Sequence, residues 1–248
     1  NAASVSLFPH VHADGDALGS VFALALALRK YEKTVRVFLC EDAEAVLRFL
    51  LPDAKSGVEV IVAGETVNVD EFDVSDLAIG VDCADSKRMD SWYGLFVKSN
   101  AKVKIDHHIP GENSNFGDIN IVNECWAATG EAIWQILKKM EIDIDYDIAV
   151  RVYTAIMTDT GRFIYSNVTS DTFEILAELI KITGSELAWI ARQIYEVKPQ
   201  RAVRFYAEVY KKIEYFFDGK FAYVFLPKSV YEHTGALLED SNAISAIM

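Results

Sequence analysis

The chain has 248 residues, 51% of them hydrophobic, which is enough for one sizeable core and part of a second. Its 37 acidic and 24 basic residues give a formal net charge of −13, which would repel a long nucleic-acid duplex and argues against a duplex-tracking protein. Small anionic substrates remain compatible with this charge, because bound divalent cations reverse the local field.

Short apolar or β-branched runs alternate with helical stretches through the first two-thirds of the chain, a rhythm typical of βαβ units with a parallel sheet. The expected strands are Val5–Phe8, Val35–Leu39, Val58–Val62, Leu77–Val81 and Val103–Ile105. The expected helices are Ala17–Tyr31, Ala43–Leu50, Ser86–Val97, Thr129–Met140, Tyr146–Met157 and Ser170–Thr183. This pattern predicts a doubly wound α/β domain with a mostly parallel sheet over residues 1–183.

From Gly184 the pattern changes to back-to-back helices, which we interpret as a helical linker over residues 184–212. Two apolar runs then flank Asp218-Gly219, a dipeptide typical of a hairpin turn. Residues 213–248 are therefore expected to begin a second, smaller α/β domain.

The segment from His10 to Ser20 lies where the first strand gives way to the first helix, at the sheet edge where such domains bind ligands. His10, Asp14 and Asp16 place an imidazole and two carboxylates close together, and Asp16 is also expected at the N-cap of the helix. A simpler interpretation, in which the aspartates only cap and turn the chain, leaves the imidazole unexplained. His12 points away from these neighbours and is expected at the rim.

Asp82 and Asp159 each follow a predicted element. Asp82 comes directly after a strand, where a lone aspartate forms a turn as often as it binds a ligand. Its neighbour Cys83 is expected to be a small buried hydrophobe. Asp159 follows a helix and could simply cap the next element. Arg162 is a candidate phosphate clamp because a guanidinium matches phosphate oxygens bidentately, although a solvated surface arginine fits equally well.

Asp106, His107 and His108 follow the last predicted strand. Two adjacent imidazoles cannot face the same metal from an extended chain, because successive side chains alternate. One histidine can therefore bind a metal while the other reaches a substrate phosphate. Asp106 can accept the spare ring N–H of the metal-binding histidine.

The ordered set of HxxxDxD, a strand-end Asp, Asp-His-His and Thr-Asp-Thr-Gly over residues 10–162 resembles the DHH phosphoesterase superfamily. The sequence is most similar to the DHH/DHHA1 branch, which contains oligoribonucleases, or nanoRNases, and phosphatases of 3′-phosphoadenosine 5′-phosphate (pAp). The resemblance implies a hydrolase that cuts short RNA and linear dinucleotides or removes the 3′-phosphate of pAp.

The resemblance also implies what each site residue does. Two divalent cations, with manganese preferred, would be held by His10, Asp14, Asp16, Asp82, His107 and Asp159. Asp82 would bridge the two, with His10 and Asp14 on one cation and the others on the second. His108 would contact the substrate phosphate. On the residues themselves, we expect Arg162 to bind the substrate as well and Asp82, Asp106 and His108 to form the catalytic set.

One departure from the family bears on the substrate. The family's C-terminal DHHA1 domain contributes a glycine-rich motif ending in histidine, and this chain contains no Gly-Gly dipeptide. We expect either that the polypeptide continues beyond Met248 or that its substrate domain is truncated. Two other functions stay open: a family II inorganic pyrophosphatase or polyphosphatase, for which Lys211-Lys212 is a poor basic cluster, and a nucleotide sensor without turnover.

Three cysteines, Cys40, Cys83 and Cys125, are odd in number and widely spaced, which fits neither a disulfide framework nor a CxxC motif. The sequence therefore predicts a protein of the reducing cytoplasm. The longest wholly apolar run, from Val21 to Leu28, is far shorter than the roughly 20 residues that a membrane span needs. No membrane partner is expected, and the sequence does not indicate an oligomeric state.

Overall fold

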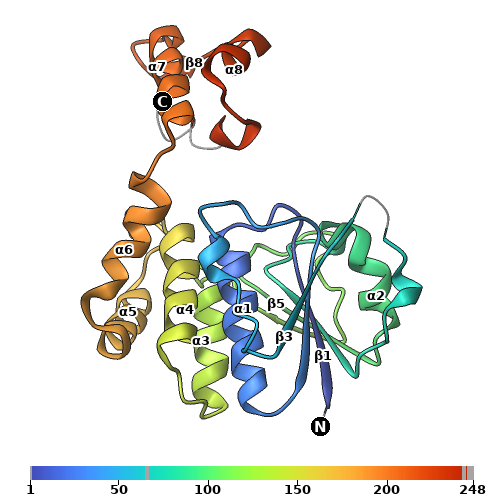
Figure 1. Ribbon diagram of the computed structural model, residues 1–248. Coiled ribbons are helices and arrows are strands. Elements are labelled where there is room, and N and C mark those ends of the chain that lie inside the picture. Colours follow the sequence, from blue (N-terminus) through green and yellow to red (C-terminus); the bar gives the residue numbers. More distant parts are fainter. Residues whose placement is uncertain (1, 65–66, 242–243, 245–248) are drawn as a thin grey trace. The chain divides into compact units, whose positions relative to one another are not determined.

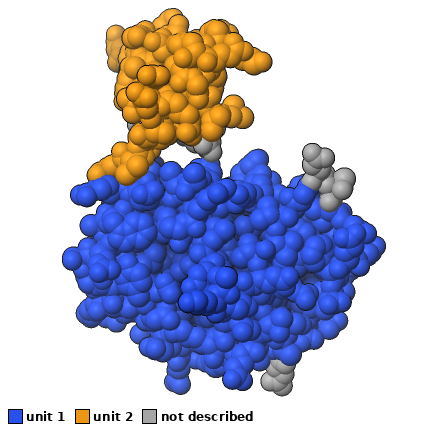
Figure 2. Space-filling view, viewed as in Figure 1, with its two compact units in different colours: residues 1–194 blue, residues 195–248 orange. Residues whose placement is uncertain are grey.

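A computed structural model of the protein describes residues 2–64, 67–241 and 244. The chain forms two compact units, residues 1–194 and residues 195–248 (Figure 2). All the polar clusters singled out from the sequence lie in the first unit. No helix in the described part of the chain is long and apolar enough to span a bilayer.

The sheet of the first unit has six strands, all parallel, in the order β3-β2-β1-β4-β5-β6. Their bounds are β1 Ser4–Pro9, β2 Thr34–Leu39, β3 Val58–Val62, β4 Leu77–Val81, β5 Ala101–Asp106 and β6 Ile119–Val122. The chain proceeds outward from β1 to β3 and then returns to the other side of β1 with β4. The segments that follow β1 and β4 therefore diverge, and the carboxyl ends of these two strands are the place where open α/β sheets commonly bind ligands.

Helices cover both faces of this sheet (Figure 1). The α-helices of the first unit are α1 Gly15–Lys30, α2 Tyr93–Lys98, α3 Thr129–Lys139, α4 Tyr146–Asp159, α5 Ser170–Thr183 and α6 Ala188–Ala191. Between them lie short 3₁₀ or π segments at Arg48–Leu50, Val69–Glu71, Ser86–Trp92, Gly184–Leu187 and Arg192–Glu196. Helices α1, α3 and α4 pack together on one face, and α2 lies on the other.

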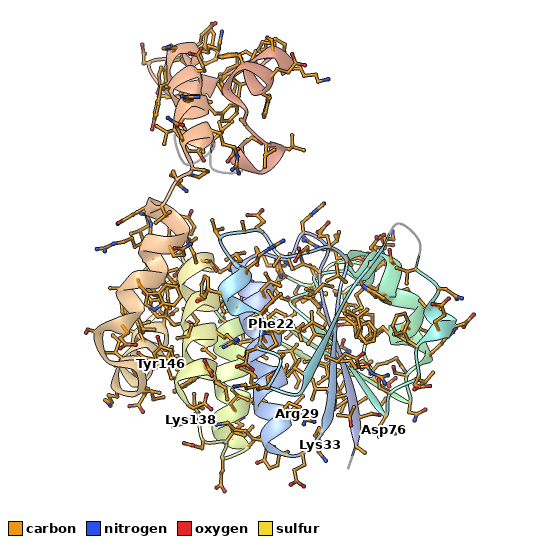
Figure 3. The ribbon with its side chains drawn as sticks, in the orientation of Figure 1. Phe22, Arg29, Lys33, Asp76, Lys138 and Tyr146 are labelled. Atoms are coloured by element: carbon orange, nitrogen blue, oxygen red, sulfur yellow. The ribbon has the colours of Figure 1, made fainter. Side chains whose placement is uncertain are left out.

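The core lies on both sides of the sheet because alternate strand residues face opposite layers. Phe8 of β1 stacks on Phe38 of β2 with ring centroids 5.1 Å apart, and both belong to the buried cluster that contains Phe96 of α2. On the other face α1 is buried along most of its length, including Phe22 in its middle (Figure 3). The predicted doubly wound α/β domain is confirmed.

Helices α1 and α4 approach closely at Gly19. A Cβ added to Gly19 would lie 2.5 Å from the carbonyl oxygen of Arg151, a backbone atom that cannot move aside. We expect Gly19→Ala to lower the free energy of unfolding by about 1–3 kcal/mol through overpacking. Gly94→Ala is the matched control, because its Cβ would meet only Val69 at 3.6 Å; urea titration should find it neutral or stabilising. Equal stability of the two variants would contradict this packing argument.

The predicted helix Ala43–Leu50 is wrong, since only Arg48–Leu50 is helical and there the turn is 3₁₀. Buried side chains at Ala43, Leu47 and Leu50 give a helical spacing. The backbone is instead fixed from outside, because the Arg151 guanidinium donates to the carbonyls of Leu50 and Leu51 at 2.8 and 3.2 Å. The five predicted strands are all present, whereas the short edge strand β6 was not predicted.

The second unit contains α7 Gln200–Lys212, α8 Lys228–Thr234 and an antiparallel hairpin of β7 Glu214–Phe216 and β8 Phe221–Tyr223. Phe205 and Val209 of α7 pack against Val230 of α8 in a separate core cluster. The segment 184–212, expected to be a linker, is thus divided between the units, and α7 is part of the second core.

Candidate metal and phosphate site

Six side chains from four separate segments meet at the carboxyl edge of the sheet, and we call them the six-residue cluster. They are His10, Asp14, Asp16, Asp82, His107 and Asp159. Two groups of three, His10 with Asp14 and Asp82 and Asp16 with His107 and Asp159, each have their ligand atoms within 4.8 Å of one another. The sequence predicted this set, and the strand order explains its assembly, because β1, β4 and β5 are adjacent in the sheet.

Asp14 and Asp16 occupy positions at the start of helix α1 that differ from those expected from the sequence. The N-cap of α1 is Asp14, whose Oδ1 accepts from the backbone N–H groups of Asp16 and Ala17 at 3.0 Å each. The expected N-cap, Asp16, is the first-turn acid, and its side chain is almost completely buried. The difference arises because α1 begins at Gly15, one residue earlier than Asp16 would require as a cap.

The buried Asp16 carboxylate is held by the N-terminus of α3. Its Oδ2 accepts from Thr129 N at 2.7 Å, and its Oδ1 accepts from Gly130 N and from Ser20 Oγ, both at 2.9 Å. The N-terminus of a helix favours a carboxylate there. Burial nevertheless raises the pKa of Asp16 well above its usual value, and the charges of Asp82 and Asp159 raise it further. A bound cation would relieve this repulsion.

Asp82 lies between His10 and Asp14 on one side and the group of Asp16, His107 and Asp159 on the other. Its Oδ2 is 3.5 Å from His10 Nε2, whereas its Oδ1 is 3.7 Å from His107 Nε2. Thr129 Oγ1 donates to the same Oδ1 at 2.8 Å and fixes the carboxylate. The backbone has φ +59°, which an aspartate tolerates better than most residues. Although burial opposes ionisation, the hydrogen bond and charge of His10 lower the pKa of Asp82.

His107 lies close to Asp16 and Asp159. Its Nε2 lies 3.4 Å from Asp159 Oδ2 and 3.7 Å from Asp16 Oδ2. Its other ring nitrogen, Nδ1, is 3.3 Å from the carbonyl oxygen of Trp126, which can accept the Nδ1–H and leave Nε2 free to bind a cation. Burial, together with the charge of Asp82, raises the pKa of Asp159 to about 6, even though His107 opposes the shift.

Asp106 contacts the other histidine, which corrects the expectation that it would orient the metal-binding ring. Its Oδ1 lies 2.8 Å from Nδ1 of His108 and accepts the backbone N–H groups of both His107 and His108. Because that hydrogen bond occupies Nδ1, Nε2 of His108 is left for a substrate. The His108 side chain is 38% exposed, so its ring is accessible. Its pKa is raised, chiefly by the hydrogen bond to Asp106.

Four residues that contact the cluster or its neighbours were missed by sequence reasoning. Arg88 Nη2 lies 2.8 Å from His10 Nδ1, Thr129 holds Asp82, Trp126 accepts from His107, and Lys104 lies beside Asp106. Lys104 and Asp106 share one strand face at a spacing of two, which is a signal that the sequence does carry. The other three contacts are set by the fold, and nothing local in the sequence indicates them.

The remaining candidates lie around this centre. His12 is exposed and pairs with Glu41, with 2.8 Å between Nδ1 and Oε1. Cys83 is fully buried, and its thiol lies 3.6 Å from the Phe8 carbonyl oxygen, as a small core residue would. Arg162 is exposed, three residues after Asp159, in a backbone turn with φ +65°.

The hydroxyl of Thr129 offers a test of the site that leaves its ligands intact. Thr129→Val removes the donor to Asp82 and keeps the backbone N–H that binds Asp16. We expect the affinity for Mn²⁺, measured by titration calorimetry, to fall about 10–100-fold. Thr154→Val is the control, because that buried hydroxyl donates only to the Val150 carbonyl of its own helix. An unchanged affinity in Thr129→Val would remove Thr129 from the site.

Comparison with known proteins gives a match to a family model described as the DHH family, N-terminal domain, over residues 4–156. The bifunctional oligoribonuclease and PAP phosphatase NrnA of Thermus thermophilus is 28% identical over 221 residues, which cover 88% of this chain and 62% of that protein. The protein of that name from Bacillus subtilis is 28% identical and is matched over 97% of this chain and 72% of its own length. The chain therefore spans about two-thirds of the length of these relatives.

Two solved structures share the fold. An exopolyphosphatase-related protein from Bacteroides fragilis has a TM-score of 0.88 at 24% identity, over 100% of this chain and 72% of that one. A putative family II inorganic pyrophosphatase of Methanococcus jannaschii has a TM-score of 0.58 at 19% identity, over 87% of this chain and 68% of its own.

Proposed function

This chain belongs to the DHH family, and we propose that it is a two-metal phosphoesterase that hydrolyses short oligoribonucleotides, linear dinucleotides and pAp. The observation that carries the proposal is the position of Asp82, whose two oxygens face His10 and His107 separately. A carboxylate so placed can bridge two cations. The names of the Thermus and Bacillus relatives supply the substrate class.

The donor set fits divalent cations. Carboxylates and imidazoles are compatible with manganese, the metal that we propose. Asp16, Asp82 and Asp159 bring three carboxylates together, and the pKa values of Asp16 and Asp159 are raised chiefly by burial and further by the neighbouring carboxylate charges, which a bound cation would neutralise. In the proposed arrangement His10 and Asp14 hold one cation, Asp16, His107 and Asp159 hold the other, and Asp82 touches both.

Two bound cations would polarise the phosphoryl oxygens and lower the pKa of the attacking water. The protein's own residues position the reaction. His108, exposed and oriented by Asp106, would donate to the substrate phosphate from Nε2 as the protonated imidazolium, the form that its raised pKa favours. Arg162 would bind a second phosphate oxygen or a neighbouring phosphate, since its guanidinium can make paired hydrogen bonds.

The second unit and the cellular setting complete the proposal. We propose that residues 213–248 begin a substrate-binding DHHA1 domain, which follows the order of domains in the family. Cys40, Cys83 and Cys125 are all free thiols, in keeping with a reducing cytoplasm. The net charge of −13 favours short substrates over long duplexes.

The test is turnover by the purified chain with Mn²⁺. We expect mononucleotide release from a diadenylate and phosphate release from pAp, followed by chromatography and a phosphate assay. Faster turnover of pyrophosphate than of either nucleotide would instead favour a pyrophosphatase. Tight nucleotide binding without any product would favour a sensor, and either outcome would overturn the proposal.

A further inference from the structure

Lys104 is a fully buried lysine that the proposed chemistry does not use. It precedes Asp106 by two residues on β5, so both side chains leave the same face of the sheet. Its Nζ lies 2.8 Å from Asp106 Oδ2, and it donates to the carbonyl oxygens of Ser114 at 3.0 Å and Ala84 at 3.2 Å. The ammonium thus donates two hydrogen bonds to backbone carbonyls and has the Asp106 carboxylate as its ion-pair partner. The charge also lies over the ring of Phe116, 5.2 Å from its centroid.

The Asp106 carboxylate connects this buried ammonium to His108. Its Oδ2 faces Lys104, and its Oδ1 faces the Nδ1 of His108 at 2.8 Å. Asp106 is itself completely buried, and among the described residues its Oδ2 accepts no hydrogen bond and has the ion pair with Lys104 as its compensating contact. Lys104 is therefore the counter-ion that compensates a buried carboxylate oxygen, and removing one partner of such a pair leaves the other uncompensated.

The contacts of Lys104 limit how Asp106 can move. A carboxylate turns easily about its last side-chain bond, because that torsion has broad wells. The ammonium is itself fixed by two backbone carbonyls, so it holds Oδ2 in place, while the backbone N–H groups of His107 and His108 donate to Oδ1. The imidazole is then oriented with Nδ1 toward Asp106, which leaves Nε2 for the substrate.

We propose that Lys104 is a positioning residue, which fixes the Asp106 carboxylate and through it the ring orientation of His108. The proposal rests on the proposed function only in that His108 contacts the substrate. Lys104 itself touches neither substrate nor cation, so its effect on turnover passes through His108.

The kinetic test compares two lysines on the same face of β5 in the full chain. Lys104→Met should lower kcat for pAp about 10–100-fold and leave KM within about threefold, as expected for an indirect contact. Lys102→Met is the matched control, since Lys102 pairs with the exposed Asp118 at 3.2 Å, and its kcat should be unchanged. In a His108→Ala background the Lys104→Met change should cost less than about twofold more, because the two residues act in series.

A second measurement does not depend on turnover. In the metal-free protein labelled with ¹⁵N-histidine, the His108 ring, identified with His108→Ala, should carry a proton on Nδ1 that exchanges slowly with water. Lys102→Met should keep that signal, and Lys104→Met should lose it. If the wild type cleaves no nucleotide, the proposed function fails and this spectrum still tests the positioning of His108.

Loss of folding is a separate outcome, because Lys104→Met leaves the buried Asp106 carboxylate uncompensated. Lys104→Gln keeps hydrogen-bond donors in the same space and is the second variant, with thermal unfolding measured for each protein. A folded Lys104→Met or Lys104→Gln protein with wild-type kcat and an unchanged His108 signal would overturn the proposal. A loss that simply multiplies with that of His108→Ala would overturn it as well.

Discussion

Asp82→Asn should lower kcat/KM for pAp and for a diadenylate by about 10³-fold or more, because loss of the bridging charge removes several kcal/mol of transition-state stabilisation. Asparagine is the informative substitution for two reasons. It tolerates the positive φ of position 82, where most residues would strain the backbone, and its amide oxygen can still accept from Thr129. The variant should therefore fold, so that the loss reports on the site.

The matched control is Asp171→Asn, an exposed aspartate in the first turn of α5. It changes the net charge by the same amount and should keep wild-type kinetics. Circular dichroism and thermal unfolding of both variants separate a lost site from a lost fold. Activity of Asp82→Asn within tenfold of the wild type would be incompatible with a bridging carboxylate.

Removal of the metal and changes of pH should both alter the thermal stability of the protein. At a free Mn²⁺ concentration 100 times its Kd, binding should stabilise the fold by about 2.7 kcal/mol, which raises Tm by about 5–10 °C for a chain of this size. Chelation with EDTA should reverse that gain together with the activity. The comparison is a pair of thermal unfolding curves, with Mn²⁺ and with EDTA, at each pH.

The stabilisation of the fold by Mn²⁺ should decrease as the pH falls. In the metal-free protein burial raises the pKa of Asp159 to about 6, so this carboxyl holds a proton below that pH, and the pKa of Asp16 is raised in the same direction. The pKa of His10 is raised as well, mainly by its hydrogen bond and charge interaction with Asp82 against the effect of burial. Mn²⁺ must displace all these protons, so its affinity falls as the pH drops through about 6.

In the metal-free protein, the dependence of stability on pH has the opposite sign. A raised carboxyl pKa stabilises the fold below the ordinary value near 4, and this stabilisation is lost as the pH rises through about 6. The Tm difference between Mn²⁺ and EDTA should thus be larger at pH 7.5 than at pH 5. An equal or larger difference at pH 5 would show that Asp16 and Asp159 do not bind the cations.

Much of the fold was predictable because short segments rich in apolar and β-branched residues recur along residues 1–122, with longer helical or loop segments between most of them. The exceptions have physical causes. The segment 43–50 has helical spacing but is shaped by the distant Arg151, and β6 is a short edge strand with two of its four residues exposed. Local pattern carries no information about either circumstance.

Part of the candidate site could likewise be predicted from the sequence, and part could not. His10, Asp82 and His107 were candidates on their residues alone because each follows a strand, whereas the full set with Asp14, Asp16 and Asp159 as metal ligands was implied by the resemblance to the DHH family and stays a prediction. Their supporting contacts could not be predicted, since Thr129 reaches Asp82 across 47 positions of sequence and the orientation of Asp106 depends on Lys104. The alternation of His107 and His108 was informative, but it did not say which ring Asp106 would hold.

The strand order also has a consequence for how the protein assembles. The six-residue cluster draws on positions from 10 to 159, and these meet only when β4 has taken its place beside β1. Folding of the first unit therefore closes the long chain loops between the ligands, and the entropy lost in closing them is part of the free energy of folding. The affinity for the cation therefore depends on the stability of the whole first unit. A substitution far from the ligands should lower this affinity if it weakens the pairing of the strands.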